Sequence, residues 1–577
     1  MLIRKLRNFR SFSRSLKFIG LFTAVLYFVI SCSLFGVADS FQTSVFDSSL
    51  PYTTTTGLGV GTNLAGIADW SSELPFVDGF KSARKWITKC AAESACGGEW
   101  DTQEYDQLDL DDQGWVKSLP DDPNSRHRRV ATLLFREIAD GYPGGQYVVL
   151  YDGTGTIEYE FDARKDQAQS RPGRDLINVT PSQAGIYLLI SATDPNQTGD
   201  YIRNIRVVPI EYENNYADVL FNPLFLERIK QFGTLRFMDW MATNHSQQKE
   251  WSDRPQVEDA TYAIKGVPIE IMVELANRLR AHPWFTLPHQ ATDEYITNFA
   301  KLVQQRLDPQ LTVYVEFSNE VWNWMFSQAQ YALQQGKSRW GNDKGDAYMQ
   351  WYGMRTAQMS DIWKNVFGNQ RDRVISIIST QTSWLGLENS ALDCPLWVAE
   401  GNKPCYQHQI DAYAITGYFS GELSLPQNQD EVESWLSNPS QARNQAWQQL
   451  ADGSVLNRPG EGDSIAAAAT SFAYHQKVAQ AKGLQLLVYE GGQHLVNPES
   501  DRLTTFFGQL NRDPQMYELY TQLLTNWQAA GGTLFMNFSD ITPFGKWGNW
   551  GLLEHVNQDR SSKYDAMMDF IQKNRLR

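Results

Sequence analysis

Short apolar segments alternate with helical patterns through most of this 577-residue chain, and this alternation limits the folds open to it. Segments that are apolar on both faces and are joined by helices are typical of a parallel sheet. Eight are expected, at Leu58–Leu64, Gly233–Trp240, Pro283–His289, Leu311–Glu320, Val374–Thr380, Ala412–Phe419, Leu484–Glu490 and Gly532–Asp540. Eight strands, each followed by a helix or a long loop, predict an α/β fold of the (β/α)₈ TIM-barrel type.

A doubly wound open sheet is the alternative arrangement. A dinucleotide-binding sheet of that type carries a glycine-rich turn after its first strand. Gly57, Gly59 and Gly61 instead precede the first expected strand or lie inside it. Their position favours the barrel.

The helical pattern nearly disappears between residues 97 and 209, where short alternating strands are separated by turn-forming clusters. The strands read TLLFREI, QYVVLYD, TIEYEFD, GIYLLISA and NIRVVPI, and the turns include DGYPGG and DPNQTGD. This texture predicts an antiparallel β-sandwich inserted into the barrel. Of its aromatic residues, Trp115, Tyr147, Tyr151 and Tyr159 are interpreted as core residues in preference to a sugar-binding face.

The expected domain boundaries follow these changes of pattern. An amphipathic helix is expected over Pro75–Ile87, directly after the first strand. In order, the expected units are a lipoprotein signal peptide at 1–31, a Ser/Thr-rich tether at 32–56, the first βα unit of the barrel at 57–94, the inserted sandwich at 95–212 and the rest of the barrel at 213–577.

The N-terminus has the features of a bacterial export signal. A basic stretch precedes an apolar run, Phe18–Ile30, that is short for a membrane span. The run ends in Val29-Ile30-Ser31-Cys32, which resembles a lipobox and implies cleavage before Cys32 and lipid attachment to its thiol. An ordinary secretory signal cut near Ala38, or an uncleaved anchor, is the alternative. The lipobox predicts an exported protein that is lipid-anchored to a bacterial membrane, at the cell surface or in the periplasm.

The cysteine count agrees with export. An exported chain pairs its thiols or uses them, and this chain has five cysteines. With Cys32 set aside, short spacings favour the disulfides Cys90–Cys96 and Cys394–Cys405. Neither pair has the spacing of a zinc site, so neither a metal nor a cofactor is expected.

The charge balance argues about the partner. The chain has 51 Lys and Arg against 66 Asp and Glu, a net charge of -15. Such a charge repels phosphate backbones and argues against nucleic acid. An uncharged ligand fits this surface better.

Two glutamates stand at the expected carboxyl ends of barrel strands, where barrel enzymes carry their catalytic groups. Glu320 ends the fourth strand and Glu490 ends the seventh. Two such carboxyl groups about 5 to 5.5 Å apart can divide glycosidic cleavage, one protonating the leaving oxygen while the other attacks the anomeric carbon. Arg236 in the second strand would keep one ionised, and a drier site would raise the pKa of the other. Glu316 shares the parity of Glu320 on its strand and is interpreted as a structural partner of Arg236.

The block Tyr314-Val315-Glu316-Phe317-Ser318-Asn319-Glu320 resembles the Tyr-x-Glu-x-x-Asn-Glu fourth strand of clan A glycoside hydrolases, in particular family 5-like enzymes. Tyr489-Glu490-Gly491-Gly492 is similar to the end of the seventh strand in that clan. The resemblance implies a retaining glycoside hydrolase with Glu320 as acid/base and Glu490 as nucleophile. Family 5 usually has Pro after the acid/base, whereas Val321 follows here, and the sandwich is foreign to the plain family, so the exact family stays open.

The same resemblance implies further site residues. Arg236 and Tyr418 are implied to hydrogen-bond the nucleophile, Asn319 to contact the sugar 2-hydroxyl, His289 to line the site and Trp547 to offer a stacking platform.

Several alternatives remain beside this reading. His494 is interpreted more readily as a loop residue than as a ligand, and Trp547 and Trp550 divide evenly between sugar stacking and loop packing. The rival function is a non-catalytic surface lipoprotein that binds polysaccharide or oligosaccharide with a degenerate barrel.

Overall fold

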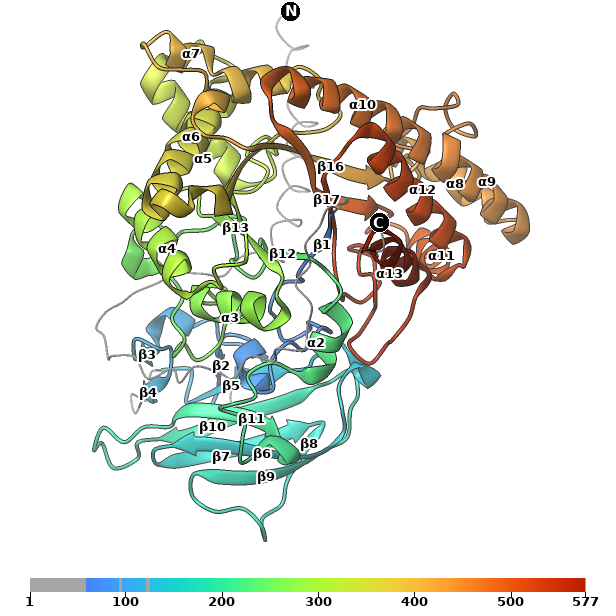
Figure 1. Cartoon of the computed structure of the whole chain (residues 1–577). Helices are drawn as coiled ribbons and strands as arrows, with labels where there is room; N and C mark the ends of the chain where they lie inside the picture. The colour runs from blue at the N-terminus through green and yellow to red at the C-terminus, as the bar shows by residue number, and fades with distance from the viewer. Residues whose placement is uncertain (1–58, 93–95, 121–124, 576–577) are drawn as a thin grey trace, which may run out of the picture.

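The computed structural model describes residues 59–92, 96–120 and 125–575. Within them, eight parallel strands close into a barrel in chain order (Figure 1). They are β1 (Gly59–Asn63), β12 (Thr234–Arg236), β13 (His282–Leu287), β14 (Val313–Phe317), β15 (Val374–Ser379), β16 (Ala412–Phe419), β17 (Gln485–Gln493) and β18 (Leu534–Asn537). Each of the eight expected segments forms a barrel strand, so the predicted TIM barrel is confirmed.

The barrel interior is filled by large side chains from several strands. Trp284, Ile377, Leu487 and Met536 belong to one buried cluster there. Arg236, at the carboxyl end of β12, is also fully buried. The interior therefore changes from apolar to polar toward the carboxyl ends of the strands.

Helices cover the outside of the barrel (Figure 1). Local capping fixes their ends: α10 begins after Ser464, whose Oγ accepts from the N–H of Ala467 at 3.1 Å, and ends at Gly483, whose φ is +70°. The helices are α2 (Pro223–Ile229), α3 (Ile269–Leu279), α4 (Asp293–Arg306), α5 (Ser327–Trp340), α6 (Ala347–Phe367), α7 (Pro395–Val398), α8 (Gln429–Trp435), α9 (Pro439–Asp452), α10 (Ile465–Lys482), α11 (Asp501–Arg512), α12 (Gln515–Ala530) and α13 (Ser562–Arg575).

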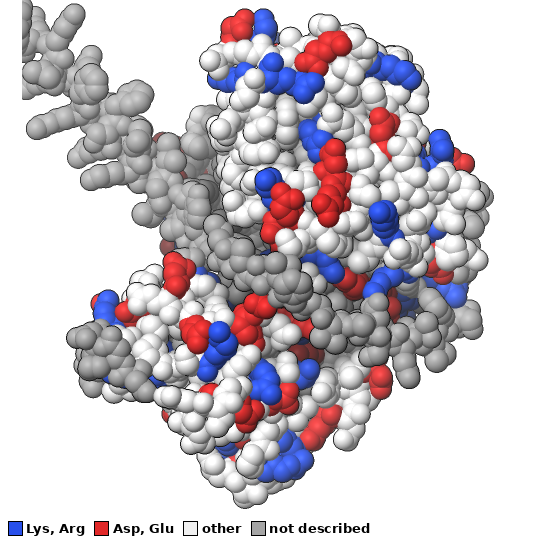
Figure 2. Space-filling view, turned by 90° about the vertical axis from the view of Figure 1, so that its left-hand side faces the viewer, with Lys and Arg blue, Asp and Glu red and all other residues white. Residues whose placement is uncertain are grey.

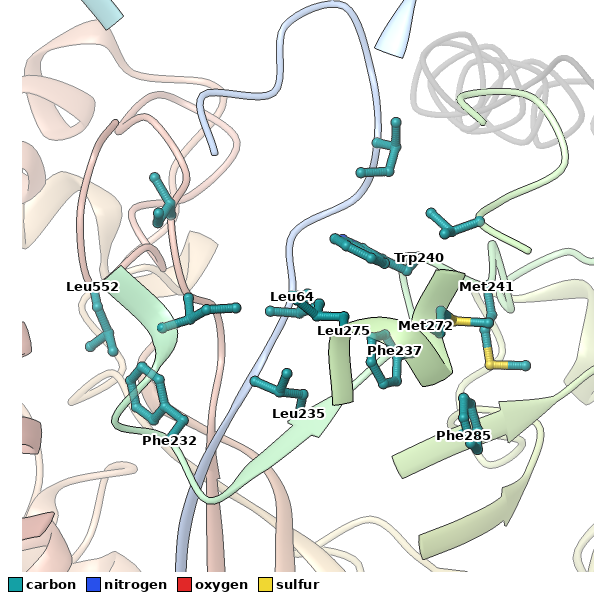
Figure 3. Packing of buried hydrophobic residues seen from close by; sticks show 14 of the residues in the cluster. Leu64, Phe232, Leu235, Phe237, Trp240, Met241, Met272, Leu275, Phe285 and Leu552 are labelled. Atoms are coloured by element: carbon teal, nitrogen blue, oxygen red, sulfur yellow. The ribbon is translucent and has the colours of Figure 1, made fainter. Parts of the chain in front are cut away.

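Packing outside β12 decides where Arg236 points. Figure 3 shows Leu235 and Phe237 among Leu64 and the α3 residues Met272 and Leu275, in one apolar cluster. Burial of each such side chain stabilises the fold by about 1.5–3 kcal/mol. Because successive strand residues face opposite sides, the residue between Leu235 and Phe237 is directed into the barrel.

Two four-stranded antiparallel sheets form the β-sandwich. One has the order β2 (Ile87–Lys89), β5 (Arg129–Leu134), β10 (Ile186–Thr193), β7 (Gly155–Phe161), and the other β11 (Arg203–Pro209), β6 (Gly145–Asp152), β9 (Arg174–Val179), β8 (Ala163–Lys165). The five expected strands correspond to β5, β6, β7, β10 and β11. Trp115, Tyr147 and Tyr159 are buried in the core and Tyr151 packs against it, as the core interpretation predicted.

The amphipathic helix expected over Pro75–Ile87 is wrong. A single 3₁₀ turn, Gly79–Ser82, forms there, and Ile87–Lys89 pairs with β5 as a strand of the sandwich. Asp78 explains the turn, because its Oδ1 accepts from the N–H of Phe80 at 3.0 Å and from that of Val207 in β11 at 2.9 Å. Tertiary pairing has overridden the helical spacing. The chain therefore leaves the barrel after β1 and enters the sandwich within the range expected to form the first βα unit.

The sandwich is docked on loops that follow β1 and β12, and it lies below the barrel in Figure 1. The ring of Phe76 lies 5.6 Å from that of Trp240 and 5.4 Å from that of Tyr262. Arg84 and Asp69 form an ion pair of 2.8 Å. These contacts come from the segment that joins β1 to the sandwich, so this segment is part of the barrel mouth.

Three further features concern cross-links, surface charge and membrane-spanning helices. Disulfides join Cys90 to Cys96 and Cys394 to Cys405, the two local pairs that their spacing predicts. Acidic and basic side chains are interspersed over the face seen in Figure 2. No helix in the described part of the chain is long and apolar enough to cross a membrane.

Candidate active site

Arg236 is the centre of a buried polar network at the carboxyl ends of the strands. Its Nη1 donates to Glu490 Oε1 at 2.6 Å and to Asn63 Oδ1 at 2.9 Å. Its Nη2 donates to Glu316 Oε2 and to Asn319 Oδ1, each at 2.9 Å, and its Nε donates to Glu316 Oε2 at 3.2 Å. A guanidinium has five N–H donors, and these five bonds use all of them.

Glu316 is the structural partner of this arginine. It is fully buried, and beside the two bonds from Arg236 it accepts from Trp284 Nε1 at 3.0 Å and from Ser379 Oγ at 2.9 Å. Every polar contact of its carboxylate is thus to the protein. The prediction that Glu316 pairs with Arg236 is confirmed, and its carboxylate is a fixed counter-charge.

Glu490 lies across the barrel with two donors of its own. Arg236 donates to Oε1, and the hydroxyl of Tyr418 donates to Oε2 at 3.0 Å. Burial raises the pKa of Glu490, while the charge and hydrogen bond of Arg236 and the hydrogen bond of Tyr418 oppose that rise. Burial outweighs these contacts and the pKa of Glu490 is raised, although the contacts themselves favour the carboxylate.

A β-bulge brings Glu490 to the interior. Between Val488 and Gly491, β17 contains one residue more than the paired stretches of β16 and β18. The extra residue lets Tyr489 and Glu490, neighbours in sequence, both reach the inside of the barrel. Tyr489 uses its place to donate from its hydroxyl to Glu320 Oε1 at 3.0 Å.

Glu320 lies in a turn beyond the end of β14. Ser318 has φ +64° and Glu320 has φ +40°, left-handed conformations that such residues adopt at a cost. The N–H of Ser318 donates to Leu287 O and that of Asn323 to Glu320 O, each at 2.8 Å. The amide of Asn323 also donates to Glu320 Oε2 at 2.9 Å. The turn thereby aims the carboxyl group of Glu320 toward Tyr489.

Burial raises the pKa of both glutamates, but their partners differ. Burial and then the charge of Glu490 raise the pKa of Glu320 to about 8, against the hydrogen bonds from Asn323 and Tyr489. Among the described residues, no cation hydrogen-bonds Glu320, whereas Glu490 is paired directly with Arg236. At neutral pH Glu320 is protonated and the contacts of Glu490 favour its carboxylate, which is the pairing that acid-assisted displacement needs.

Asn319 is fixed by residues that the sequence did not single out. Its Oδ1 accepts from Arg236, and its Nδ2 donates to Asn244 Oδ1 at 3.1 Å. Gln328 Nε2 donates to Asn244 Oδ1 at 2.7 Å and to Asn319 O at 2.8 Å. Asn244 lies in the long loop after β12 and Gln328 in α5, so no strand-end rule points to them. Asn63, by contrast, ends β1 and that rule would have found it.

Tyr418 and Trp547 are two further residues expected at the site. Tyr418 contacts Glu490, and its ring lies 5.1 Å from that of His494. Trp550 donates from its indole N–H to His494 Nδ1 at 3.2 Å, so this histidine lies between Trp550 and Tyr418 in a chain of contacts. Trp547 in the same loop is 48% exposed, with Lys546 Nζ 4.9 Å from its ring centre.

His289 is buried at the end of β13. Burial lowers its pKa to about 4, so the imidazole is neutral. Its ring lies 5.2 Å from that of Tyr331, and its Nδ1 has no hydrogen-bond partner among the described residues.

More carboxyl groups surround the site. Asp239, after β12, has its pKa raised to about 7 by burial and by the charge of Glu490. Asp540, after β18, has its pKa raised to about 7 by burial, and Glu73 interacts with it. The mouth of the barrel is therefore rich in acids.

Within the described ranges, no group of three or more His, Cys, Asp or Glu side chains has the arrangement of a metal site. Cys32 lies outside the described residues.

The sequence matches no protein-family model and no curated protein. Solved structures with a similar barrel include an endo-β-1,4-xylanase of glycoside hydrolase family 10 from Gloeophyllum trabeum, with 11% identity and a TM-score of 0.33 over 60% of this chain and 90% of that chain. A GH5-4 broad-specificity endoglucanase from Clostridium acetobutylicum has 10% identity and a TM-score of 0.33 over 60% and 90%. A family 1 β-glucosidase from Thermotoga maritima has 11% and 0.33 over 61% and 85%.

The raised pKa of Glu320 predicts a pH-dependent stability cost. The native state binds this proton more tightly than the unfolded chain, so stability falls as pH rises from about 4.5 toward 8. Glu320→Gln removes that loss, and we expect its Tm to exceed that of the parent by about 2 °C or more at pH 9 but not at pH 4.5. Glu316→Gln is the control, because it breaks the pair with Arg236 and lowers Tm at both pH values. An equal difference between parent and Glu320→Gln at both pH values would contradict the assignment.

Proposed function

We propose that this protein is a retaining glycoside hydrolase that cleaves a polysaccharide or oligosaccharide, with Glu490 as nucleophile and Glu320 as acid and then base. The observation that carries the proposal is the unequal treatment of two facing glutamates. Arg236 and Tyr418 favour the carboxylate of Glu490, whereas burial and the charge of Glu490 favour the protonated form of Glu320. A hydrolase of this type needs both forms at one pH.

In the first step Glu490 attacks the anomeric carbon and the bond from that carbon to the leaving oxygen breaks. Glu320 gives its proton to that oxygen, so the alcohol leaves neutral. Arg236 keeps its bonds to Glu316 and Asn319 while its bond to Glu490 weakens, because the attacking carboxylate loses charge. The hydroxyl of Tyr418 is placed to keep donating to the carboxylate of Glu490 during this attack.

In the second step a water molecule attacks the same carbon from the side that the alcohol left. Glu320, now ionised, takes the proton of that water, and the bond from the sugar to Glu490 breaks. Two displacements at one carbon restore its configuration. No cofactor takes part in either step.

Other side chains suit substrate contact in this scheme. One N–H of the Asn319 amide remains beyond its bond to Asn244 and is available to a sugar 2-hydroxyl. His289 lines the site from the end of β13, with its neutral ring buried. Trp547 offers an exposed indole for stacking on a sugar face.

Replacing each glutamate tests the assignment of roles. We expect Glu490→Gln to lower kcat/KM by about 10⁴-fold or more on any glycan that the parent cleaves, because the nucleophile is lost. Glu320→Gln is expected to lower it by about 10²- to 10⁴-fold on natural glycosides. Its loss should be much smaller for the release of dinitrophenolate, which needs no proton. Reducing-end and absorbance assays measure both effects, and Glu294→Gln on the exposed face of α4 is the matched control.

Two outcomes would count against this function. Full activity in either variant would exclude its glutamate from the reaction, and proton NMR that shows an inverted product anomer would exclude double displacement. A parent protein that binds glycans from a library without releasing reducing ends would favour the non-catalytic binding protein instead.

The pH profile of activity tests the role of Glu320 as acid. We expect kcat/KM to fall as pH rises through about 8, where the protonated form is lost. Tyr489→Phe removes a hydrogen bond that favours ionised Glu320, so this limb should move up by about half a pH unit. Tyr517→Phe, on α12, is the control and should leave it in place. A limb that is unmoved, or moved downward, in Tyr489→Phe contradicts the proposed acid.

We also propose that the protein is exported and lipid-anchored through Cys32, on the basis of the Val29-Ile30-Ser31-Cys32 sequence. The two disulfides support export, since such bonds persist in oxidising compartments. In a bacterial host, we expect Cys32→Ser to abolish palmitate labelling and to leave the signal segment uncleaved, which mass spectrometry of the N-terminus measures. Ser33→Ala should change neither. An unlabelled parent would sink the lipoprotein proposal.

A further inference from the structure

Glu73 and Asp540 form a buried pair of carboxyl groups beside the candidate site. They are 0% and 2% exposed. Glu73 Oε1 accepts from Trp240 Nε1 at 3.2 Å, and Asp540 Oδ1 accepts from the N–H of Ala65 at 3.0 Å. The other two oxygens, Glu73 Oε2 and Asp540 Oδ2, are buried without an N–H or hydroxyl donor among the described residues. A hydrogen bond between the two carboxyl groups would give both of these oxygens a partner, and the electrostatic interaction of Glu73 with Asp540 agrees with one.

Such a bond requires a proton between the two groups. Ionised carboxylates accept hydrogen bonds and donate none, so two of them can bond only when one is protonated. Asp239 adds a third negative group that acts on both. Burial and the charge of Asp540 raise the pKa of Glu73 well above its usual range, and Glu73 therefore carries the proton.

The pair joins two segments that are distant in sequence. Glu73 belongs to the segment that leads from β1 to the sandwich, and Asp540 is the third residue of the loop 538–561. The same two segments meet again where Ser72 Oγ donates to Glu554 O at 2.7 Å and the N–H of Val556 donates to Ser72 O at 3.0 Å. The segment thus contacts the loop 538–561 near both ends of that loop.

The loop 538–561 touches the candidate site in two places. The N–H of Asp540 donates to Asn63 O at 3.0 Å, and the side chain of Asn63 accepts from Arg236. Farther along, Trp550 donates to His494, whose ring lies beside Tyr418. Both routes end on a residue that hydrogen-bonds Glu490.

We propose that Glu73 is a positioning residue: the proton it shares with Asp540 clamps the segment leading to the sandwich onto the loop 538–561 and so holds Asn63 and Trp550 in place. The effect of the clamp on catalysis by Glu490 rests on the proposed function. The need for a proton between Glu73 and Asp540 does not. Opening the clamp exposes Glu73 to water, and an exposed glutamate is ionised at neutral pH, so Glu73 then releases the proton. Opening therefore becomes easier as pH rises.

Hydrogen exchange followed by mass spectrometry tests the shared proton directly. In the parent, we expect the protection of peptides from 538–561, corrected for intrinsic exchange, to fall about tenfold per pH unit between pH 7 and 8.5, because one proton leaves on opening. Protection of α6 should stay constant. In Glu73→Gln the amide donates to Asp540 without a titrating proton, so protection of the loop should persist and its pH dependence should be lost.

Two comparisons separate the clamp from general destabilisation. Asp69→Asn breaks the ion pair with Arg84 on the same segment and should leave the pH dependence of the loop unchanged. On a glycan that the parent cleaves, Glu73→Ala should lower kcat/KM about tenfold and Glu73→Gln should restore it. Protection of 538–561 that does not vary with pH in the parent overturns the proposal even if no variant folds. An equal slope in Glu73→Gln overturns it as well, and neither result bears on the glycosidase assignment.

Discussion

The saturated guanidinium of Arg236 is the interaction on which the rest of the site depends. Its five N–H groups reach β1, β14 and β17 from β12, so one side chain ties half of the barrel strands together at their carboxyl ends. Removing one partner of such a buried pair costs about 3–5 kcal/mol, because a charge is left unpaired. A saturated guanidinium also has no donor left for a substrate. Its role is to fix charge on Glu490 and to hold Asn319, with Glu316 as its permanent counter-ion.

Around this centre the protein accepts several unfavourable local states. Glu320 has a left-handed backbone, Glu490 is buried, and Glu73 and Asp540 face each other. Each costs stability on its own, and each is adjacent to the proposed chemistry. The large apolar core of the barrel and of the sandwich offsets these costs, since it extends as one cluster through both units. Concentration of strain in one region is what a site with divided protonation requires.

The parts of the structure that follow local periodicity could be predicted from sequence. All eight barrel strands could be placed because each is an apolar run with turn signals around it, and Glu316 could be paired with Arg236 from strand parity. The helix expected over Pro75–Ile87 failed because Asp78 and the pairing of Ile87 with Ala131 are tertiary effects. Strand β9 escaped notice because its sequence, RDLINV, begins with two charged residues.

The finer geometry of the site was less accessible for the same reason. Strict alternation along β17 would turn Glu490 away from Tyr489, and only the bulge brings both inward. Nothing in the local sequence marks that bulge. Glu73 and Asp540 lie near opposite ends of the described chain, so their contact has no sequence signal at all. Gln328 lies in a helix and acts through an amide, a group too common to stand out.

The position of β1 has a consequence for synthesis. Asn63 and Arg236 are separated by 173 residues, most of them in the sandwich, and β1 pairs with β18 as well as with β12. The first strand therefore emerges from the ribosome long before either of its neighbours, and it waits unpaired while the sandwich folds. A folded insert whose two ends lie together brings β1 and β12 to one place and lowers the entropy cost of closing so long a loop. The inserted domain is therefore synthesised between β1 and the strand that pairs with it. The carboxylate network is among the last parts of the molecule to assemble.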